Sequence, residues 1–304
     1  MDARTAALLA PLADGRYDRL ALHLRRGMGD RPGDRRFPGR TEPAGVEVEA
    51  HRPYAPGDDL RHLDWNALAR LDALLVRRFT AEREVVFHLL VDASGSMGMP
   101  DAKLATAIEI ATALAYLALA SNDAVRPVVL PADGPPRATA VLRGGHRAGG
   151  VARAAACFAA ARAAGRLAVG DALAAYAAEH ARPGAVVVVS DFLLDPGSLQ
   201  PGIEALRRAG HEVALLHVLA ASEVDPAGGF RHAVLRDVES GTTRPIALGR
   251  AALAAYRAAL EEHLAALAAL AARSGAAYAR ITAGESVRDF VTLGLSAAGL
   301  VRRR

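Results

Sequence analysis

The sequence predicts an α/β protein with a doubly wound, mostly parallel sheet, preceded by a separate N-terminal segment. Two segments, "VVFHLLV" at 85–91 and "AVVVVS" at 185–190, are continuous apolar runs, which are typical of parallel strands covered by helices on both faces. From residue 84 onward strand-like and helix-like segments alternate, and this order favours a doubly wound sheet. With 304 residues and a hydrophobic content of 52%, the chain can bury a sizeable core.

The expected elements of the α/β domain begin with the apolar strand at 85–91. The most apolar helical stretch, "LATAIEIATALAYLALA", predicts a helix over 101–120. The stretch "DVESGTT" at 237–243 predicts a hairpin turn with Ser240 and Gly241 at its tip. The other expected strands lie at 124–130, near 137–142, and at 185–190, 212–219, 232–238 and 276–281. The other expected helices lie near 147–163 and 170–180, at 198–209 and 250–273, and from 285 onward.

Composition divides the chain into an N-terminal segment at 1–82 and an α/β domain at 83–304. The segment contains the Pro/Gly/Arg-rich connector "GMGDRPGDRRFPGR", and the net charge of +4 is unevenly distributed. Eight arginines precede or lie within this connector, namely Arg16, Arg19, Arg25, Arg26, Arg31, Arg35, Arg36 and Arg40. We expect a solvated basic arm and no nucleic-acid partner, because aromatic residues make up only 5% of the chain and no nucleic-acid motif occurs.

The compartment is predicted from what the sequence lacks. One cysteine, Cys157, permits no internal disulfide, and a small buried thiol in a reducing compartment is the simpler interpretation. The first 20 residues lack the pattern of a secretory signal. The apolar helix carries Glu109 and is bounded by Lys103 and Asp123, which falls short of a span of about 20 apolar residues. We therefore expect a cytoplasmic protein without a membrane span.

Two predicted strands end in a carboxylate. Asp92 follows the strand at 85–91, and Asp191 follows the strand at 185–190. If these strands are neighbours, both acids lie at the edge of the sheet where doubly wound proteins bind ligands, with Ser94 and Ser96 beside them. Two facing carboxylates repel each other unless a cation, a proton or a basic side chain lies between them. Hydroxyl and carboxylate oxygens are ligands that suit Mg²⁺ or Mn²⁺. The alternative is a purely structural role, in which these residues only cap turns.

The stretch "VDASGSMG" resembles the metal-ion-dependent adhesion site of von Willebrand factor type A domains, whose first motif is D-x-S-x-S at the end of a core strand. The resemblance implies a von Willebrand factor type A-like fold. It also implies that Asp92, Ser94 and Ser96 are metal ligands of the first loop and that Asp191 is the later aspartate.

One position departs from this pattern. Type A domains usually supply a threonine from a middle loop, and the matching stretch here, "GRLAVGDAL" at 165–173, has Leu167 at that position. Because no threonine occurs between Thr139 and Thr242, a shifted register cannot restore the ligand. We therefore expect that Asp171 or water substitutes for the threonine, or that metal binding is weak or absent.

Upstream, "YAPGDDLRHLDW" resembles the hallmark of the bacterial domain-of-unknown-function family 58, in which it precedes the type A motif. The match extends in order over roughly residues 45–300, with Leu63 in place of the usual isoleucine. The matching residues are Tyr54, Pro56, Gly57, Asp58, Asp59, Arg61, Asp64 and Trp65.

The residues of this hallmark also predict local structure. Pro56 and Gly57 favour a turn, and Asp58 and Asp59 can accept backbone N–H groups while pairing with Arg61 or Arg70. Trp65, the only tryptophan, is expected to pack into the core. The favoured interpretation is a staple between the N-terminal segment and the α/β domain, and the alternative is a partner-binding role.

Catalysis is not predicted. The chain has no nucleophile elbow, Walker A loop, H-E-x-x-H or Cys-x-x-Cys motif, and its ten histidines are scattered. The family resemblance implies a protein-binding module associated with a MoxR-type AAA+ ATPase in complex assembly or chaperone-like maturation. It also implies a divalent ion whose coordination is completed by a partner carboxylate. The alternatives are a metal-free scaffold of the same fold and a metal-dependent hydrolase using Asp92 and Asp191.

Overall fold

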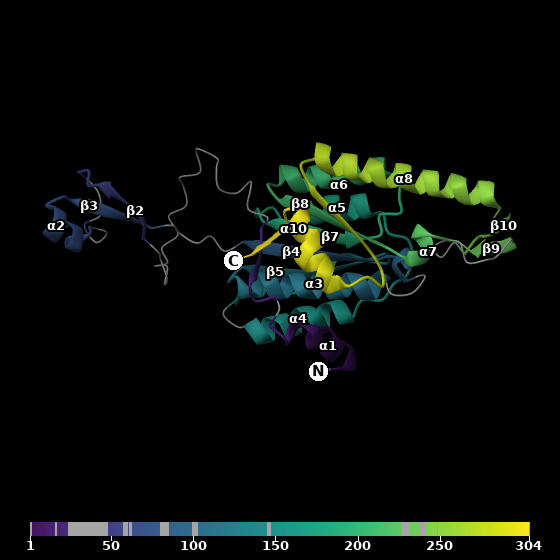
Figure 1. The fold of residues 1–304 in the computed structure, drawn as a ribbon, viewed down its shortest axis with the longest axis horizontal. Coiled ribbons are helices and arrows are strands. Elements are labelled where there is room, and N and C mark those ends of the chain that lie inside the picture. The colour runs from purple at the N-terminus through teal and green to yellow at the C-terminus, as the bar shows by residue number, and fades with distance from the viewer. Residues whose placement is uncertain are drawn as a thin grey trace. The chain divides into compact units, whose positions relative to one another are not determined.

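The computed structural model describes two compact units of the chain (Figure 1). One contains Met1–Asp30 together with Val85–Arg304, and the other contains Arg31–Glu84. The described residues are 2–15, 17–23, 48–56, 60, 63–79, 85–98, 103–144, 147–226, 232–236, 241–247 and 249–303.

A six-stranded sheet forms the centre of the larger unit, with the strand order β11-β8-β7-β4-β5-β6. All neighbouring strands are parallel except β6, which pairs antiparallel with β5 at one edge. The prediction of a mostly parallel, doubly wound sheet is therefore confirmed. The strands are β4 (Val86–Ala93), β5 (Ala124–Pro131), β6 (Arg137–Ala138), β7 (Ala185–Ser190), β8 (Glu212–Leu219) and β11 (Ala277–Thr282).

Helices cover both faces of this sheet (Figure 1). The helices α5 (Val169–Glu179), α6 (Pro196–Arg208) and α8 (Arg250–Arg273) lie on one face, and α3 (Lys103–Ala120) and α4 (Arg147–Ala159) lie on the other. Successive strand residues point to opposite faces, so Leu89 of β4 joins the core beside α3, while Leu90 joins the core beside α5 and α6. Because each face needs an apolar layer, the strands are apolar throughout, as the sequence predicts.

The helix α3 is the centre of one of these layers. By length and apolar composition it could cross a membrane, and it is the only such helix within the described residues. In the fold, however, 78% of that stretch is buried, and it packs against β4, β5 and α4 as a core helix does.

The N-terminal residues belong to the larger unit, which differs from the predicted division at residue 83. The helices α1 (Ala3–Leu9) and η1 (Ala10–Leu12) lead to β1 (Leu20–Leu22), which pairs antiparallel with β12 (Val301–Arg303). Tyr17, Leu20 and Leu22 are buried in the core cluster beside α3. The two ends of the chain therefore close one unit together, a non-local pairing that composition does not reveal.

Several smaller elements also differ from the prediction. The short strand near 137–142 is reduced to β6 and an isolated bridge between Leu142 and Val125, and the helix predicted from 285 is broken. Its pieces are α9 (Val287–Asp289), the π-helical η5 (Phe290–Gly294) and α10 (Leu295–Ala297). The unpredicted α7 (Ala221–Val224) follows β8. The predicted hairpin is formed by β9 (His232–Arg236) and β10 (Thr243–Ala247), with Gly241 at φ 71° and Ser240 outside the described residues.

The smaller unit contains the hallmark stretch. Its strands β2 (Val48–Pro53) and β3 (Leu75–Phe79) pair antiparallel, and α2 (Trp65–Leu71) lies between them in sequence. Asp64 caps α2, because its Oδ1 accepts hydrogen bonds from the backbone N–H groups of Asn66 and Ala67 at 3.0 and 3.1 Å. Its Oδ2 lies 2.7 Å from His51 Nε2 on β2.

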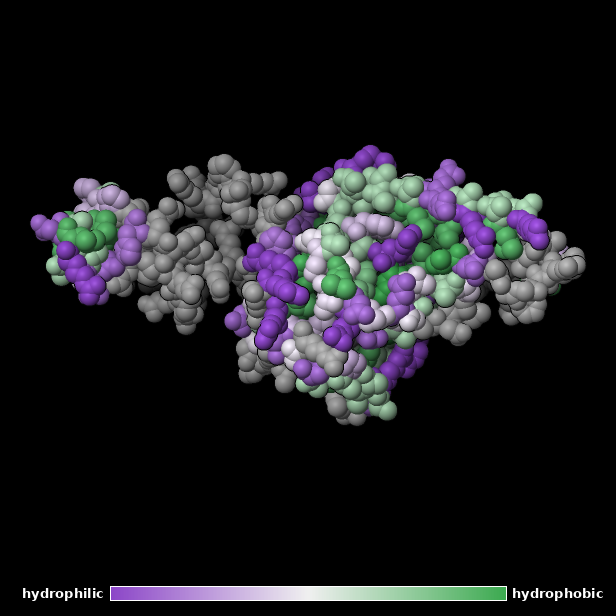
Figure 2. Space-filling view, in the orientation of Figure 1, coloured by the Kyte–Doolittle hydropathy of each residue, from purple (hydrophilic) through white to green (hydrophobic). Residues whose placement is uncertain are grey.

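Within its own unit, Trp65 is not buried in a core, in contrast to the expectation. Its side chain is 61% exposed, and Leu60, Leu71 and Leu74 are exposed as well. Figure 2 shows hydrophobic surface on this unit. The short helix α2 has no buried residue, so it offers no apolar layer under which a tryptophan could be covered. Tyr54 and Pro56 lie in the loop after β2, whereas the predicted roles of Gly57, Asp58, Asp59 and Arg61 fall outside the described residues.

The burial of β1 makes a first prediction. Replacing Leu20 by alanine should lower the free energy of unfolding of the larger unit by about 2–5 kcal/mol, because a buried leucine leaves a cavity. Chemical denaturation followed by circular dichroism measures this, and Leu293→Ala, at a side chain 68% exposed in the same unit, should change it by less than about 0.5 kcal/mol. Equal effects of the two substitutions would show that Leu20 of β1 does not belong to the core.

The exposure of Trp65 makes a second prediction. Trp65→Ala should leave the protection of the β2 and β3 amides against hydrogen exchange unchanged within about 0.5 kcal/mol. Val76→Ala, at a buried residue of β3, should lower that protection by about 1–3 kcal/mol. A large loss from the tryptophan substitution alone would show that Trp65 packs within this unit.

Candidate functional site at the carboxyl edge of the sheet

The candidate site lies where the strand order of the sheet reverses. β4 is followed by β5 on one side, and the chain then returns to place β7 on the other side of β4. In the parallel register Val91 pairs with Val189, so Asp92 at the end of β4 and Asp191 after β7 leave the sheet at the same edge. This is the position where doubly wound proteins bind ligands.

The structure brings most of the predicted site residues into one cavity. Asp92, Ser94, Ser96 and Asp191 line a cavity of about 490 Å³, together with Leu167. Asp171 is exposed in the first turn of α5 and is not among the lining residues, so it does not supply the oxygen that Leu167 lacks. The expectation of a substitute ligand at Asp171 is therefore not met by the geometry.

Asp92 is buried and hydrogen-bonded through both carboxylate oxygens. The backbone N–H of Ser94 donates to Oδ1 at 2.7 Å, and the hydroxyl of Ser190 donates to Oδ2 at 2.6 Å. Burial raises the pKa of Asp92 to about 6, and the nearby Asp191 charge acts in the same direction, while the two hydrogen bonds oppose the shift. Ser190, at the end of β7, is a functional neighbour that the sequence analysis did not single out.

The loops around Asp92 are held against the end of β4. Ser94 and Ser96 stand at the start of η3 (Gly95–Gly98), with their hydroxyl oxygens 3.0 Å apart. The backbone N–H of Gly95 donates to the carbonyl of Gly165 at 2.8 Å, which anchors the loop that carries Leu167. Gly165 has φ 66°, a conformation that favours glycine, so this loop turns at the position where the matching motif begins.

Asp191 is compensated by a basic side chain from α3. Lys103 is buried at the first residue of that helix, and its Nζ donates to Asp191 Oδ2 at 2.7 Å and to Glu223 Oε1 at 2.6 Å. The other oxygen of Glu223 accepts the backbone N–H of Ala220 at 2.7 Å. Phe192, at φ 42°, turns the chain directly after Asp191. A cation, a proton or a basic side chain can relieve the repulsion between the two acids. At Asp191 the structure uses a basic side chain, that of Lys103.

Sequence reasoning missed Lys103 and Glu223. The available signal was a single lysine at the start of a mostly apolar helix, since a lysine that becomes buried there needs an acid as its partner. That signal says nothing of which acid, because Asp191 and Glu223 lie 88 and 120 residues away.

This donor set does not fit a divalent cation. Both oxygens of Asp92 and one oxygen of Asp191 already accept short hydrogen bonds, and Leu167 offers no oxygen. Among the residues that the structure describes, no group of three or more His, Cys, Asp or Glu side chains could hold a metal ion.

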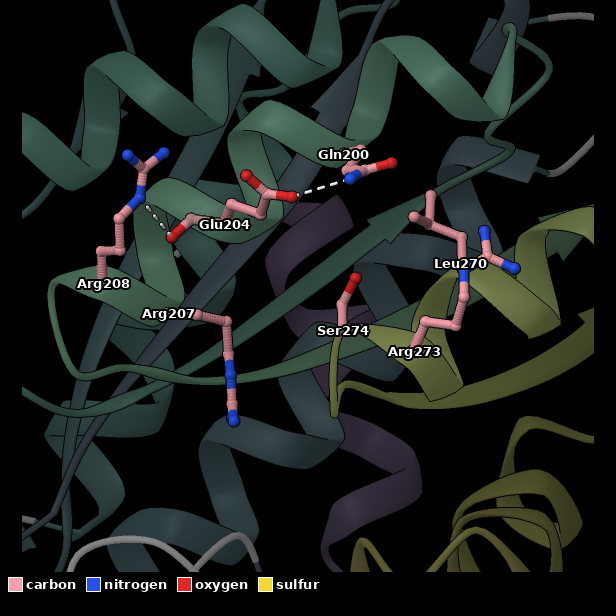
Figure 3. Close-up of a pocket in the computed structure, with 7 residues that line it drawn as sticks. All are labelled: Gln200, Glu204, Arg207, Arg208, Leu270, Arg273 and Ser274. Atoms are coloured by element: carbon pink, nitrogen blue, oxygen red, sulfur yellow. Dashed lines mark hydrogen bonds between the residues drawn. The ribbon is translucent and has the colours of Figure 1, made fainter.

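A second cavity, of about 570 Å³, lies between the ends of α6 and α8. Figure 3 shows the guanidinium groups of Arg207, Arg208 and Arg273 pointing in different directions, not toward a common point. Each arginine stands in the last turn of its helix, where a positive charge offsets the helix dipole. This arrangement is structural and does not form a convergent anion site.

The chain matches the family described as "Protein of unknown function DUF58" over residues 50–286. It belongs to this DUF58 family. Similar proteins include uncharacterized proteins of Mycobacterium bovis and Mycobacterium tuberculosis, each 32% identical over 226 residues that cover 70% of this chain and 69% of theirs. The predicted resemblance to this family is thus confirmed.

Solved structures similar to this chain include proteins of three bacteria. The conserved hypothetical protein BatB of Bacteroides thetaiotaomicron has a TM-score of 0.45 and 17% identity, covering 71% of this chain and 98% of its own. An aerotolerance-related membrane protein of Bacteroides fragilis has a TM-score of 0.41 and 16% identity, covering 70% and 99%. The pilus adhesin SpaC of Lactobacillus rhamnosus GG has a TM-score of 0.42 and 10% identity, covering 74% and 31%.

The raised pKa of Asp92 makes a third prediction. Because its folded-state pKa of about 6 lies above the ordinary value of 3.8, ionised Asp92 destabilises the fold as pH rises through 6. Asp92→Asn should raise the free energy of unfolding by about 1–3 kcal/mol at pH 8, and this gain should vanish near pH 4. Denaturant unfolding at both pH values measures it, with the exposed Asp133→Asn as a control. A lower free energy of unfolding for Asp92→Asn than for the wild type at pH 8 would contradict the conclusion that ionised Asp92 destabilises the fold.

Proposed function

We propose that this DUF58 protein is a non-enzymatic, cytoplasmic protein-binding module that acts with a MoxR-type AAA+ ATPase in complex assembly or chaperone-like maturation. The family resemblance supports the ATPase as partner. The observation that carries a binding role is the cavity at the carboxyl edge, which combines hydroxyl groups, buried acids and an apolar rim.

The rim of this cavity has the composition of a protein contact surface. Leu193 lines the cavity with its side chain 45% exposed, and Leu167 and Leu194 are half-buried beside it. Ser96 and Asp195 add polar groups to the same rim. An exposed leucine surrounded by partly buried leucines and polar groups resembles the centre and border of a protein interface.

A metal-free scaffold of the same fold is the second candidate. The contact between Lys103 and Asp191 favours it, because this contact uses a carboxylate that a metal-dependent site would need for its ion. In both proposals the protein acts by binding, and they differ in whether a divalent ion takes part at the carboxyl edge.

The proposed contact makes a fourth prediction. Leu193→Asp should weaken binding to the MoxR-type ATPase of the same organism about tenfold or more, because it places a charge in the centre of the contact. Biolayer interferometry with the two purified proteins measures the dissociation constant. Leu293→Asp, at an exposed leucine that does not line the cavity, is the matched control and should bind as the wild type does.

Two outcomes would contradict this proposal. Binding that Leu193→Asp leaves intact would place the contact on another surface. No binding between the purified wild-type protein and the ATPase at micromolar concentration would overturn the choice of partner.

A further inference from the structure

The ammonium group of Lys103 lies beside Asp191, where a metal ion at this site would bind. Its ammonium group is buried, with a fully covered side chain, and it contacts two carboxylates from different parts of the chain. Asp191 follows β7, and Glu223 lies in α7 after β8, so one lysine at the start of α3 joins three segments at the carboxyl edge. This ammonium group is paired with two acids, and removing it would leave the buried Asp191 and the partly buried Glu223 without their cation.

An ion and this ammonium group on the same carboxylate would lie close enough to repel each other. A divalent ion such as Mg²⁺ binds carboxylate oxygens at about 2.0–2.1 Å. Since Nζ is 2.7 Å from Asp191 Oδ2, an ion on that oxygen would lie within about 5 Å of the ammonium group. The two positive charges would repel each other strongly in a buried setting, where screening by water is weak.

The second change at the site acts in the same direction. Leu167 lines the cavity with an apolar side chain where an oxygen ligand would be required. An apolar wall disfavours a hydrated ion, and an internal ammonium group supplies the positive charge that the acids require. The missing oxygen and the added positive charge come from two independent residues. Leu167 lies in the loop before α5, and Lys103 is the first residue of α3. Both residues favour a site without a metal ion.

We infer that Lys103 is a built-in cation that replaces the divalent ion at the carboxyl edge, so that this site binds neither Mg²⁺ nor Mn²⁺ until the lysine charge is removed. The site then holds Asp191 and Glu223 on one internal ammonium group. As an extension that rests on the proposed function, partner binding at this edge uses the hydroxyl and leucine side chains of the rim and needs no bridging ion.

The test is a titration of the purified protein with Mn²⁺, followed by the loss of the free-ion electron paramagnetic resonance signal. The wild type, Leu167→Thr and Lys103→Arg should all show no saturable binding, because each keeps a positive charge beside Asp191. Lys103→Ala should gain saturable binding, and the double variant Lys103→Ala/Leu167→Thr should bind Mn²⁺ with a dissociation constant of about 10⁻³ M or tighter. Lys103→Met, which removes the charge but keeps the volume, should bind less tightly than Lys103→Ala.

Thermal unfolding gives a second readout that does not depend on a fully stable variant. About 10 mM Mg²⁺ should raise the Tm of Lys103→Ala and leave that of the wild type and Lys103→Arg unchanged, because only a ligand of the folded state stabilises it. If Lys103→Ala does not fold even with the ion, Lys103→Ala/Glu223→Gln, which also removes one acid, should fold and show the same gain.

Two results would overturn the inference. Saturable Mn²⁺ binding by the wild type that Asp191→Asn abolishes would show that the lysine and the ion coexist. Folded charge-removing variants without any gain in Mn²⁺ affinity would show that the lysine does not occupy an ion position. Because the titration uses the protein alone, the loss of a partner contact would leave its result unaffected.

Discussion

The parallel pairing of β4 with β7 determines the chemistry of the carboxyl edge. It places Asp92 and Asp191 at the same end of neighbouring strands, in a region that helices cover on both faces. Two buried acids at such a position need separate compensation, and the structure provides it by different means. Asp92 receives hydrogen bonds from Ser94 and Ser190, whereas Asp191 receives the ammonium group of Lys103.

Helix packing explains why part of the motif remains although its threonine position is occupied by leucine. Gly170, in the "GDAL" part of the motif, lies where α5 and α6 meet, and a Cβ atom there would come within 2.0 Å of the Ser198 carbonyl oxygen. Gly202 on α6 is restricted in the same way by the carbonyl of Gly170. The glycine is therefore required for the close approach of two helices, independently of any ligand at Leu167.

The compensating contacts also hold the edge together as one unit. Lys103 connects the start of α3 to the residues after β7 and β8, and Ser190 connects β7 to β4. The cavity between these elements is thus lined by side chains whose positions are set by buried hydrogen bonds, while Leu193 on its rim is exposed. The proposed protein contact rests on this combination of a polar cavity and an accessible apolar rim.

The sequence by itself determined the α/β class, the order of most strands and helices, and the meeting of Asp92 with Asp191. These follow from local signals, since apolar runs predict buried strands and parallel strands end at a common edge. Only the tertiary structure decided that Lys103 neutralises Asp191, that β1 pairs with β12, and that Trp65 is exposed. The physical reason is that each depends on contacts, or on the lack of a covering layer, between segments far apart in the chain, and no local pattern of residues specifies which distant segment will lie alongside.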